Sequence, residues 1–258
     1  SVMGVQAASI GVGMVVITTL GGQLGTLGFK YSYFINIIGF ISMILIAILL
    51  PETGVVKITK TQKIKLNKSV FKTSFFGMIE FLFLITFTTN IAMHISESVA
   101  GGSGLTGIIT GLFSASQIVI GLILGYVTKI TKSYTLPVAM CCFSVGAILL
   151  IVFPGNYLML SVAAVFCGFS QGMFIPQAMV DVSNAVSPAA TAMAAAVFTC
   201  MMSVGQLISP VVINAISTGI FKEATTTNAY VVAAIGMTIF AIILFINIYV
   251  GKTKETNK

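Results

Sequence analysis

Charged residues are scarce in this chain of 258 residues. Asp, Glu, Lys and Arg together make up 7% of the sequence, whereas 57% is hydrophobic. A soluble domain carries about 25% charged residues, and even a large one must cover a wet surface. The shortage excludes an ordinary soluble protein and predicts that lipid surrounds most of the folded chain.

Arginine is absent, so the chain has no planar guanidinium for a bidentate grip on phosphate or carboxylate. The net charge of +7 comes from lysines that lie in expected loops and in the C-terminal tail, not on an amphipathic helix face. This placement argues against a nucleic-acid partner.

Groups for catalysis and metal binding are also few. His94 is the only histidine and Asp181 the only aspartate. The serine in GGSG at 101–104 lies in the same short region as His94, so the two lack the opposed placement that a nucleophile and its base require. One aspartate provides no aspartyl pair. We therefore expect no enzyme and no metal site, and no repeated filter or charged ring suggests a channel.

The cysteines all fall inside apolar runs, and no CxxC spacing suggests zinc or redox chemistry. We expect buried free thiols, because small polarizable side chains suit helix interfaces. They are Cys141, Cys142, Cys167 and Cys200.

Long apolar runs dominate the sequence. A membrane-spanning helix needs about 20 apolar residues, and helices satisfy their own backbone hydrogen bonds in lipid. The sequence predicts an all-α polytopic membrane protein with about eight spans: 8–28, 31–50, 74–94, 105–127, 135–153, 157–181, 191–217 and 229–250.

Lysines give these spans an orientation. The segment KITKTQKIKLNKSVFK at 57–72 holds six lysines and no acid, and lysine excess marks the cytoplasmic side of short loops. With this segment in the cytoplasm, the loop with Lys129 and Lys132 and the C-terminal tail lie there too, leaving only Lys30 and Lys222 outside. We expect a multi-pass protein of the plasma membrane with both termini of this chain cytoplasmic.

Small residues and prolines recur inside the spans. Glycine pairs four residues apart allow helices to approach closely in lipid, and segments interrupted by glycine and proline point to a transporter's binding region. Two segments qualify, GFSQGMFIPQ at 168–177 and SVGQLISP at 203–210. The glycine pairs are Gly21/Gly25, Gly107/Gly111, Gly121/Gly125 and Gly168/Gly172.

Four stretches, together with the helix layout, resemble the back two-thirds of a major facilitator superfamily (MFS) transporter. They match the family's glycine-rich fifth helix, its exit into the central loop, its repeated glycine-then-basic loop and its eleventh helix. In order they are GVGMVVITTLGGQLGTLGFKYSYF (11–34), LPET (50–53), GLILGYVTKITKSY (121–134) and SVGQLISPVV (203–212). Two positions depart from the antiporter form, because Ile17 and Thr18 stand where that form has Gly-Pro.

The resemblance implies an MFS-type helical bundle in which the chain supplies the last eight of twelve helices. Residues 1–50 would be the last two helices of the N-terminal half, 51–73 a basic cytoplasmic linker, and 74–258 the complete C-terminal six-helix half and tail. The chain opens at Ser1 without an initiator Met or a signal sequence, so we expect the missing N-terminal helices of a parent protein as its partner.

The function implied by the resemblance is secondary active transport of small molecules by alternating access. Proton-coupled efflux of drugs or metabolites is the first expectation, with a proton gradient in place of a cofactor. A nutrient or metabolite importer of the same fold is the alternative, as is an inactive fragment.

Polar residues inside the spans are the candidate site residues, because such groups are costly in lipid. Glu80 is the leading candidate for proton coupling. Asp181, with Lys129 or Lys132 as its partner, resembles a cytoplasmic gate. His94 is expected to be interfacial. The amides that would line a cavity are Asn90, Gln117, Gln171, Gln177 and Gln206.

Overall fold

The computed structural model describes residues 2–49, 66–99 and 102–256. Over these ranges the chain is helical and contains no strand, so the predicted all-α class is confirmed. Its elements are α1 (Val2–Leu27), α2 (Phe29–Ser32), η1 (Tyr33–Asn36), α3 (Ile37–Leu49), α4 (Lys68–Ser98), α5 (Ser103–Thr131), η2 (Lys132–Tyr134), α6 (Thr135–Val152), α7 (Tyr157–Asn184), η3 (Pro188–Ala190), α8 (Thr191–Phe221) and α9 (Thr226–Thr256).

Each expected span coincides with one helix, except 31–50, which is divided among α2, η1 and α3. Among the described residues, five continuous helical segments are long and apolar enough to cross a membrane, and two shorter apolar helices lie near the N-terminus. The segment Ser103–Val152 contains both α5 and α6, joined by η2. The chain is therefore a polytopic membrane protein.

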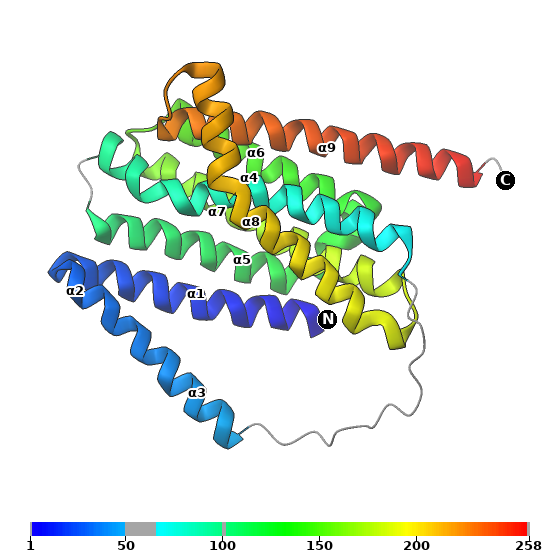
Figure 1. Cartoon of the computed structure of the whole chain (residues 1–258), viewed down its shortest axis with the longest axis horizontal. Helices are drawn as coiled ribbons and strands as arrows, with labels where there is room; N and C mark the ends of the chain where they lie inside the picture. The colour runs from blue at the N-terminus through cyan, green and yellow to red at the C-terminus, as the bar shows by residue number, and fades with distance from the viewer. Residues whose placement is uncertain (1, 50–65, 100–101, 257–258) are drawn as a thin grey trace.

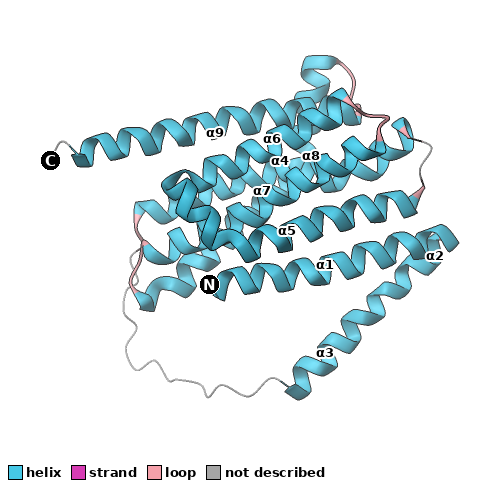
Figure 2. Ribbon diagram, turned by 180° about the vertical axis from the view of Figure 1, so that it is seen from behind, coloured by secondary structure: helices cyan, strands magenta, loops and turns pink. Residues whose placement is uncertain are grey.

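Helices α4 to α9 form one bundle, and α1 lies along its edge against α5 (Figure 1). In contrast, α3 turns away from the bundle after α2 and η1 and buries none of its residues (Figure 2). The start of α4 and the end of α9 lie at the same end of the bundle (Figure 1). Lys68 and Lys72 of α4 lie at that end, and Lys132 lines the same cavity as Lys72, whereas Lys30 belongs to α2 at the other end.

Glycines set the closest helix contacts. A Cβ on Gly168 or Gly172 of α7 would collide with the backbone of α5, so only glycine allows these helices to lie together there. On α1, Gly22 meets Gly107 of α5 backbone to backbone. The predicted packing is thus confirmed for Gly107, Gly111, Gly168 and Gly172, whereas a Cβ on Gly21 or Gly125 would meet nothing within 4 Å.

Helix α8 crosses α4 through a second small-residue contact. Gly205 lies directly against the carbonyl of Met78, and one turn later Ser209 Oγ donates a hydrogen bond to the carbonyl of Leu82. The two contacts are four residues apart on both helices, which keeps α8 tightly packed on α4 over that turn. Pro210 follows immediately, inside α8 as the sequence predicted.

The cysteines divide between core and surface, and all four are free thiols. Cys167 is buried and Cys142 half-buried, but Cys141 and Cys200 are exposed. The prediction of four buried thiols is therefore wrong for two of them. An apolar run identifies a helix in lipid, but the outward face of such a helix is also apolar.

The basic linker falls largely outside the described residues, as does Lys258 of the tail. The last part of the linker belongs to α4, which begins at Lys68 and is capped by the side chain of Asn67. Lys68 and Lys72 therefore lie on the first turns of a helix.

Candidate functional site

Glu80 lies in the middle of α4 and is fully buried. Its Oε1 accepts a hydrogen bond of 2.7 Å from the hydroxyl of Ser170 on α7. The other oxygen, Oε2, has no hydrogen-bond partner among the described residues. A carboxyl group with one tethered and one open oxygen, shielded from water, is suited to hold or release a proton.

The sequence places Ser170 beside Glu80 through the packing of α7. Ser170 lies midway between Gly168 and Gly172, the residues that seat α7 on α5. Because α7 is fixed there, the hydroxyl of Ser170 is held in the interior, where it is 0% exposed. Sequence reasoning did not select Ser170, although it lies within the singled-out segment at 168–177.

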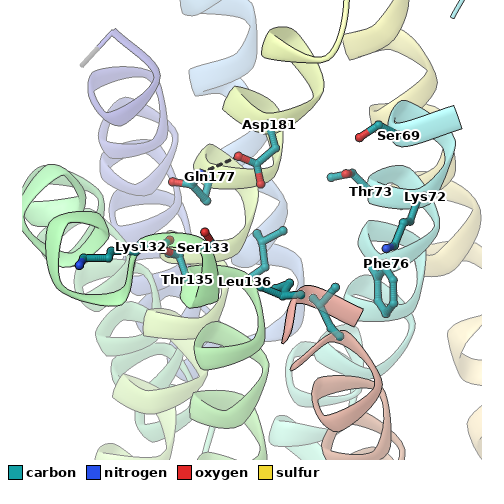
Figure 3. Close-up of a pocket in the computed structure, with 12 residues that line it drawn as sticks. Ser69, Lys72, Thr73, Phe76, Lys132, Ser133, Thr135, Leu136, Gln177 and Asp181 are labelled. Atoms are coloured by element: carbon teal, nitrogen blue, oxygen red, sulfur yellow. Dashed lines mark hydrogen bonds between the residues drawn. The ribbon is translucent and has the colours of Figure 1, made fainter. Parts of the chain in front are cut away.

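A second polar region is a cavity of about 280 Å³ between α4, α6, α7 and α9 (Figure 3). It lies at the end of the bundle where α4 begins. Eight of its lining residues carry hydroxyl, amide or charged groups, and four are apolar. The lining residues are Ser69, Lys72, Thr73, Phe76, Lys132, Ser133, Thr135, Leu136, Gln177, Asp181, Leu244 and Ile248.

Asp181 faces this cavity from α7 and is half-buried. Its Oδ1 accepts a hydrogen bond of 2.7 Å from Nε2 of Gln177, one turn earlier on the same helix (Figure 3). Across the cavity, Lys72 donates a hydrogen bond of 3.4 Å to Asn247 of α9. The structure thus brings Gln177 and Asp181 together.

The gate lysines are not the partners of Asp181 in this structure. Lys132 shares the cavity, but its amino group points away from Asp181 in Figure 3. Lys129 is exposed in the last turn of α5. Within the described part of the chain, Asp181 binds the amide of Gln177 and forms no ion pair with either lysine.

Two of the remaining amides lie near an open groove between α4 and α8. The groove has a volume of about 480 Å³, and Gln206 lines it together with Thr88, Thr89 and Ser203. Asn90 is half-buried nearby on α4 and donates to the carbonyl of Thr86. The groove combines hydroxyl and amide groups with apolar walls.

The other two amides lie on the packed helices α5 and α7. Gln117 is 3% exposed and Gln171 half-buried. The Oε1 atom of each has no hydrogen-bond partner among the described residues. These unpaired acceptors are open to a donor from outside the described residues.

His94 lies in the last turns of α4, and its side chain is completely buried. The first turn of α9 covers it, and this tertiary contact leaves no mark in the local sequence. In the described ranges, no group of three or more His, Cys, Asp and Glu side chains lies close enough to hold a metal ion.

A comparison with protein families matches residues 73–258 to the model described as Major Facilitator Superfamily. This range runs from the second turn of α4 to the C-terminus and includes Glu80, the groove, and all cavity-lining residues except Ser69 and Lys72. No curated protein matches the chain. Because the match covers well over half of the sequence, the chain belongs to the major facilitator superfamily, a family of membrane transporters rather than enzymes.

Proposed function

We propose that this chain is part of a secondary active transporter that exports small, largely apolar molecules in exchange for protons. The helices would rock around a site near the membrane midplane. Four further helices of a parent protein, packed against α1 and α3, would complete the N-terminal half of the transporter. The exposed apolar surface of α3 supports this part of the proposal.

The observation that carries the proposal is the environment of Glu80. A charged group in the middle of a membrane helix is costly and marks a functional position by default. Glu80 is 0% exposed and has one neutral hydrogen-bond donor, Ser170. No cation is bonded to it within the described residues. A carboxyl group without a counter-ion is suited to alternate between its protonated and charged forms as the bundle opens and closes.

The groove between α4 and α8 supports the proposal that the substrate is a small amphipathic molecule. Its walls are apolar at Ile85, Leu207 and Pro210, whereas Thr88 and Gln206 offer hydrogen-bonding groups. Ligand sites of this kind hold a mostly apolar molecule and orient it with a few polar contacts. Glu80 and the groove both use α4, so movement of this one helix would couple proton binding to substrate binding.

The lysines support an orientation for the same proposal. One end of the bundle carries Lys68, Lys72, Lys129 and Lys132. We propose that this end lies in the cytoplasm. The membrane would be the plasma membrane.

The test is transport in inverted membrane vesicles with an imposed pH gradient. Ethidium and a neutral lipophilic dye are the first probes. We expect dye accumulation in the native protein and loss of its dependence on the gradient in Glu80→Gln, which keeps the size of the side chain but cannot ionise.

Glu223→Gln is the matched control, since Glu223 is an exposed acid in the turn between α8 and α9. Normal gradient-driven transport by Glu80→Gln would overturn the coupling role. Dye movement in the opposite direction would favour the importer.

A further inference from the structure

A second buried polar cluster lies at the other end of the bundle, opposite Lys68. His94 and Glu97 come from the last turns of α4, and Thr226 and Tyr230 from the first turns of α9. His94 and Tyr230 are both 0% exposed, and Thr226 is 3% exposed. Glu97, in contrast, is exposed. The cluster therefore connects the surface with the interior through residues that the transport proposal does not use.

The hydrogen bonds of the cluster fix the protonation of one ring nitrogen. Thr226 Oγ1 donates its only proton to Oε2 of Glu97 at 2.8 Å. Since that hydroxyl has no second proton, its contact of 3.0 Å with His94 Nδ1 requires the ring nitrogen to be the donor. The neutral form of His94 thus carries its proton on Nδ1, and the lone pair is on Nε2.

The free nitrogen, Nε2, faces the interior. No hydrogen bond to it meets ordinary geometry within the described residues. The Tyr230 ring packs edge-on against the imidazole, with centroids 5.1 Å apart at 88°. The backbone carbonyl of Leu150, at the end of α6, is close enough to interact with the ring.

The charges around the ring come from several helices. The nearest acid is Glu97, which is linked to the ring through the hydroxyl of Thr226. Tyr230 faces the ring from α9, and the thiol of Cys167 on α7 lies near the tyrosine. Lys222 and Glu223 are exposed in the turn before α9. Glu97, relayed through Thr226, is thus the carboxylate that can balance a charge on His94.

We propose that His94 is a second proton-binding site, at the end of the bundle opposite the lysines, with Glu97 as its counter-ion through the hydroxyl of Thr226. A proton from the solution on that side binds Nε2, and the ring becomes an imidazolium that donates from both nitrogens. The relayed His94–Thr226–Glu97 bonds strengthen when both ends are charged, so proton uptake fastens α9 to α4. The binding of this proton does not depend on the proposed transport. Only its use in transport rests on the proposed function.

The direct test is nuclear magnetic resonance of protein labelled with ¹⁵N-histidine, in detergent micelles, from pH 4.5 to 8.5. The His94 signal is assigned by its loss in His94→Gln. In the native protein we expect a neutral ring protonated on Nδ1 at the alkaline end and an imidazolium at the acidic end. In Thr226→Val the Nδ1 proton loses its acceptor and Glu97 its link, so the midpoint shifts by about half a pH unit or more.

Thr227→Val, one residue along α9, is the matched control and leaves the midpoint unchanged. A native ring that stays neutral at pH 4.5, or a titration that is the same in Thr226→Val, would overturn the proposal. The measurement needs no transport, so its outcome is independent of Glu80→Gln in vesicles. If His94 titrates as expected while Glu80→Gln transports normally, the proton site stands and the coupling role of Glu80 fails.

Discussion

Glu80 and Asp181 are both carboxylates on long apolar helices, yet their surroundings differ. Glu80 is sealed inside the bundle with a single hydroxyl donor from another helix. Asp181 is half-buried on the wall of a cavity and is bonded to an amide of its own helix. The first arrangement suits a group that binds and releases a proton out of contact with water. The second suits a group whose partners change when the cavity opens or closes.

The largest effect is expected from a substitution that disturbs α7, the helix that carries Asp181 and donates a hydrogen bond to Glu80 from Ser170. In Gly168→Leu the new side chain would collide with the backbone of α5 at Phe113. We expect a loss of about 3 kcal/mol in stability, or a fall of about 10 °C in Tm. A thiol-reactive dye measures it through exposure of the buried Cys167, once Cys141, Cys142 and Cys200 have been replaced by serine in both proteins.

Gly125→Leu is the control for that change, because a Cβ on Gly125 would meet nothing within 4 Å. Equal thermal stability of the two leucine variants would contradict the assigned packing of α7.

A more specific substitution removes only the hydroxyl group that donates a hydrogen bond to Glu80. Ser170→Ala leaves the carboxyl group without its hydrogen bond. Since a hydrogen bond to a charged group contributes about 1.5–3 kcal/mol, we expect gradient-driven transport to fall about tenfold. Ser144→Ala, at another buried serine, is the control. Unchanged coupling in Ser170→Ala would mean that Glu80 works without this contact.

A smaller effect is expected at the cavity. Asp181→Asn keeps an oxygen that accepts from Gln177 but removes the charge. Interactions of partly exposed charges contribute about 0.2–1 kcal/mol, so we expect the transport rate to fall by about threefold, while the number of protons per dye stays the same. A loss of coupling as severe as that of Glu80→Gln would abolish the distinction between the two acids.

The smallest effect is expected in the groove. Gln206 is exposed and is one of several polar groups around a mostly apolar surface. We expect Gln206→Ala to raise the KM for dye by about twofold, within about 0.5 kcal/mol, with kcat unchanged. A change in kcat alone would place Gln206 in the helix movement instead of the groove.

The sequence predicted the helices well because span length and apolarity follow from the bilayer. Glu80 stood out for the same reason, as an acid inside a predicted span. Its partner could not be predicted, since Ser170 is 90 residues away and meets Glu80 only through the packing of α7 on α5.

Asp181 and His94 show the limits of local patterns. For Asp181 the nearest loop lysines were the natural partners, but Gln177 lies one helical turn away and reaches it without a loop movement. For His94 the end of a span predicted a depth in the membrane, but it could not show that the start of α9 covers the ring. In both cases the decisive contact depends on how helices pack, which hydropathy alone does not encode.

The central claim is that Glu80 exchanges a proton inside the bundle. Infrared difference spectroscopy of the purified protein, recorded between acidic and alkaline buffer, tests it without any knowledge of the substrate. The account predicts a protonated-carboxyl band, of a frequency typical of an apolar setting, that disappears on alkalinisation in the native protein and is absent from Glu80→Gln. Identical difference spectra for the two proteins would contradict the claim.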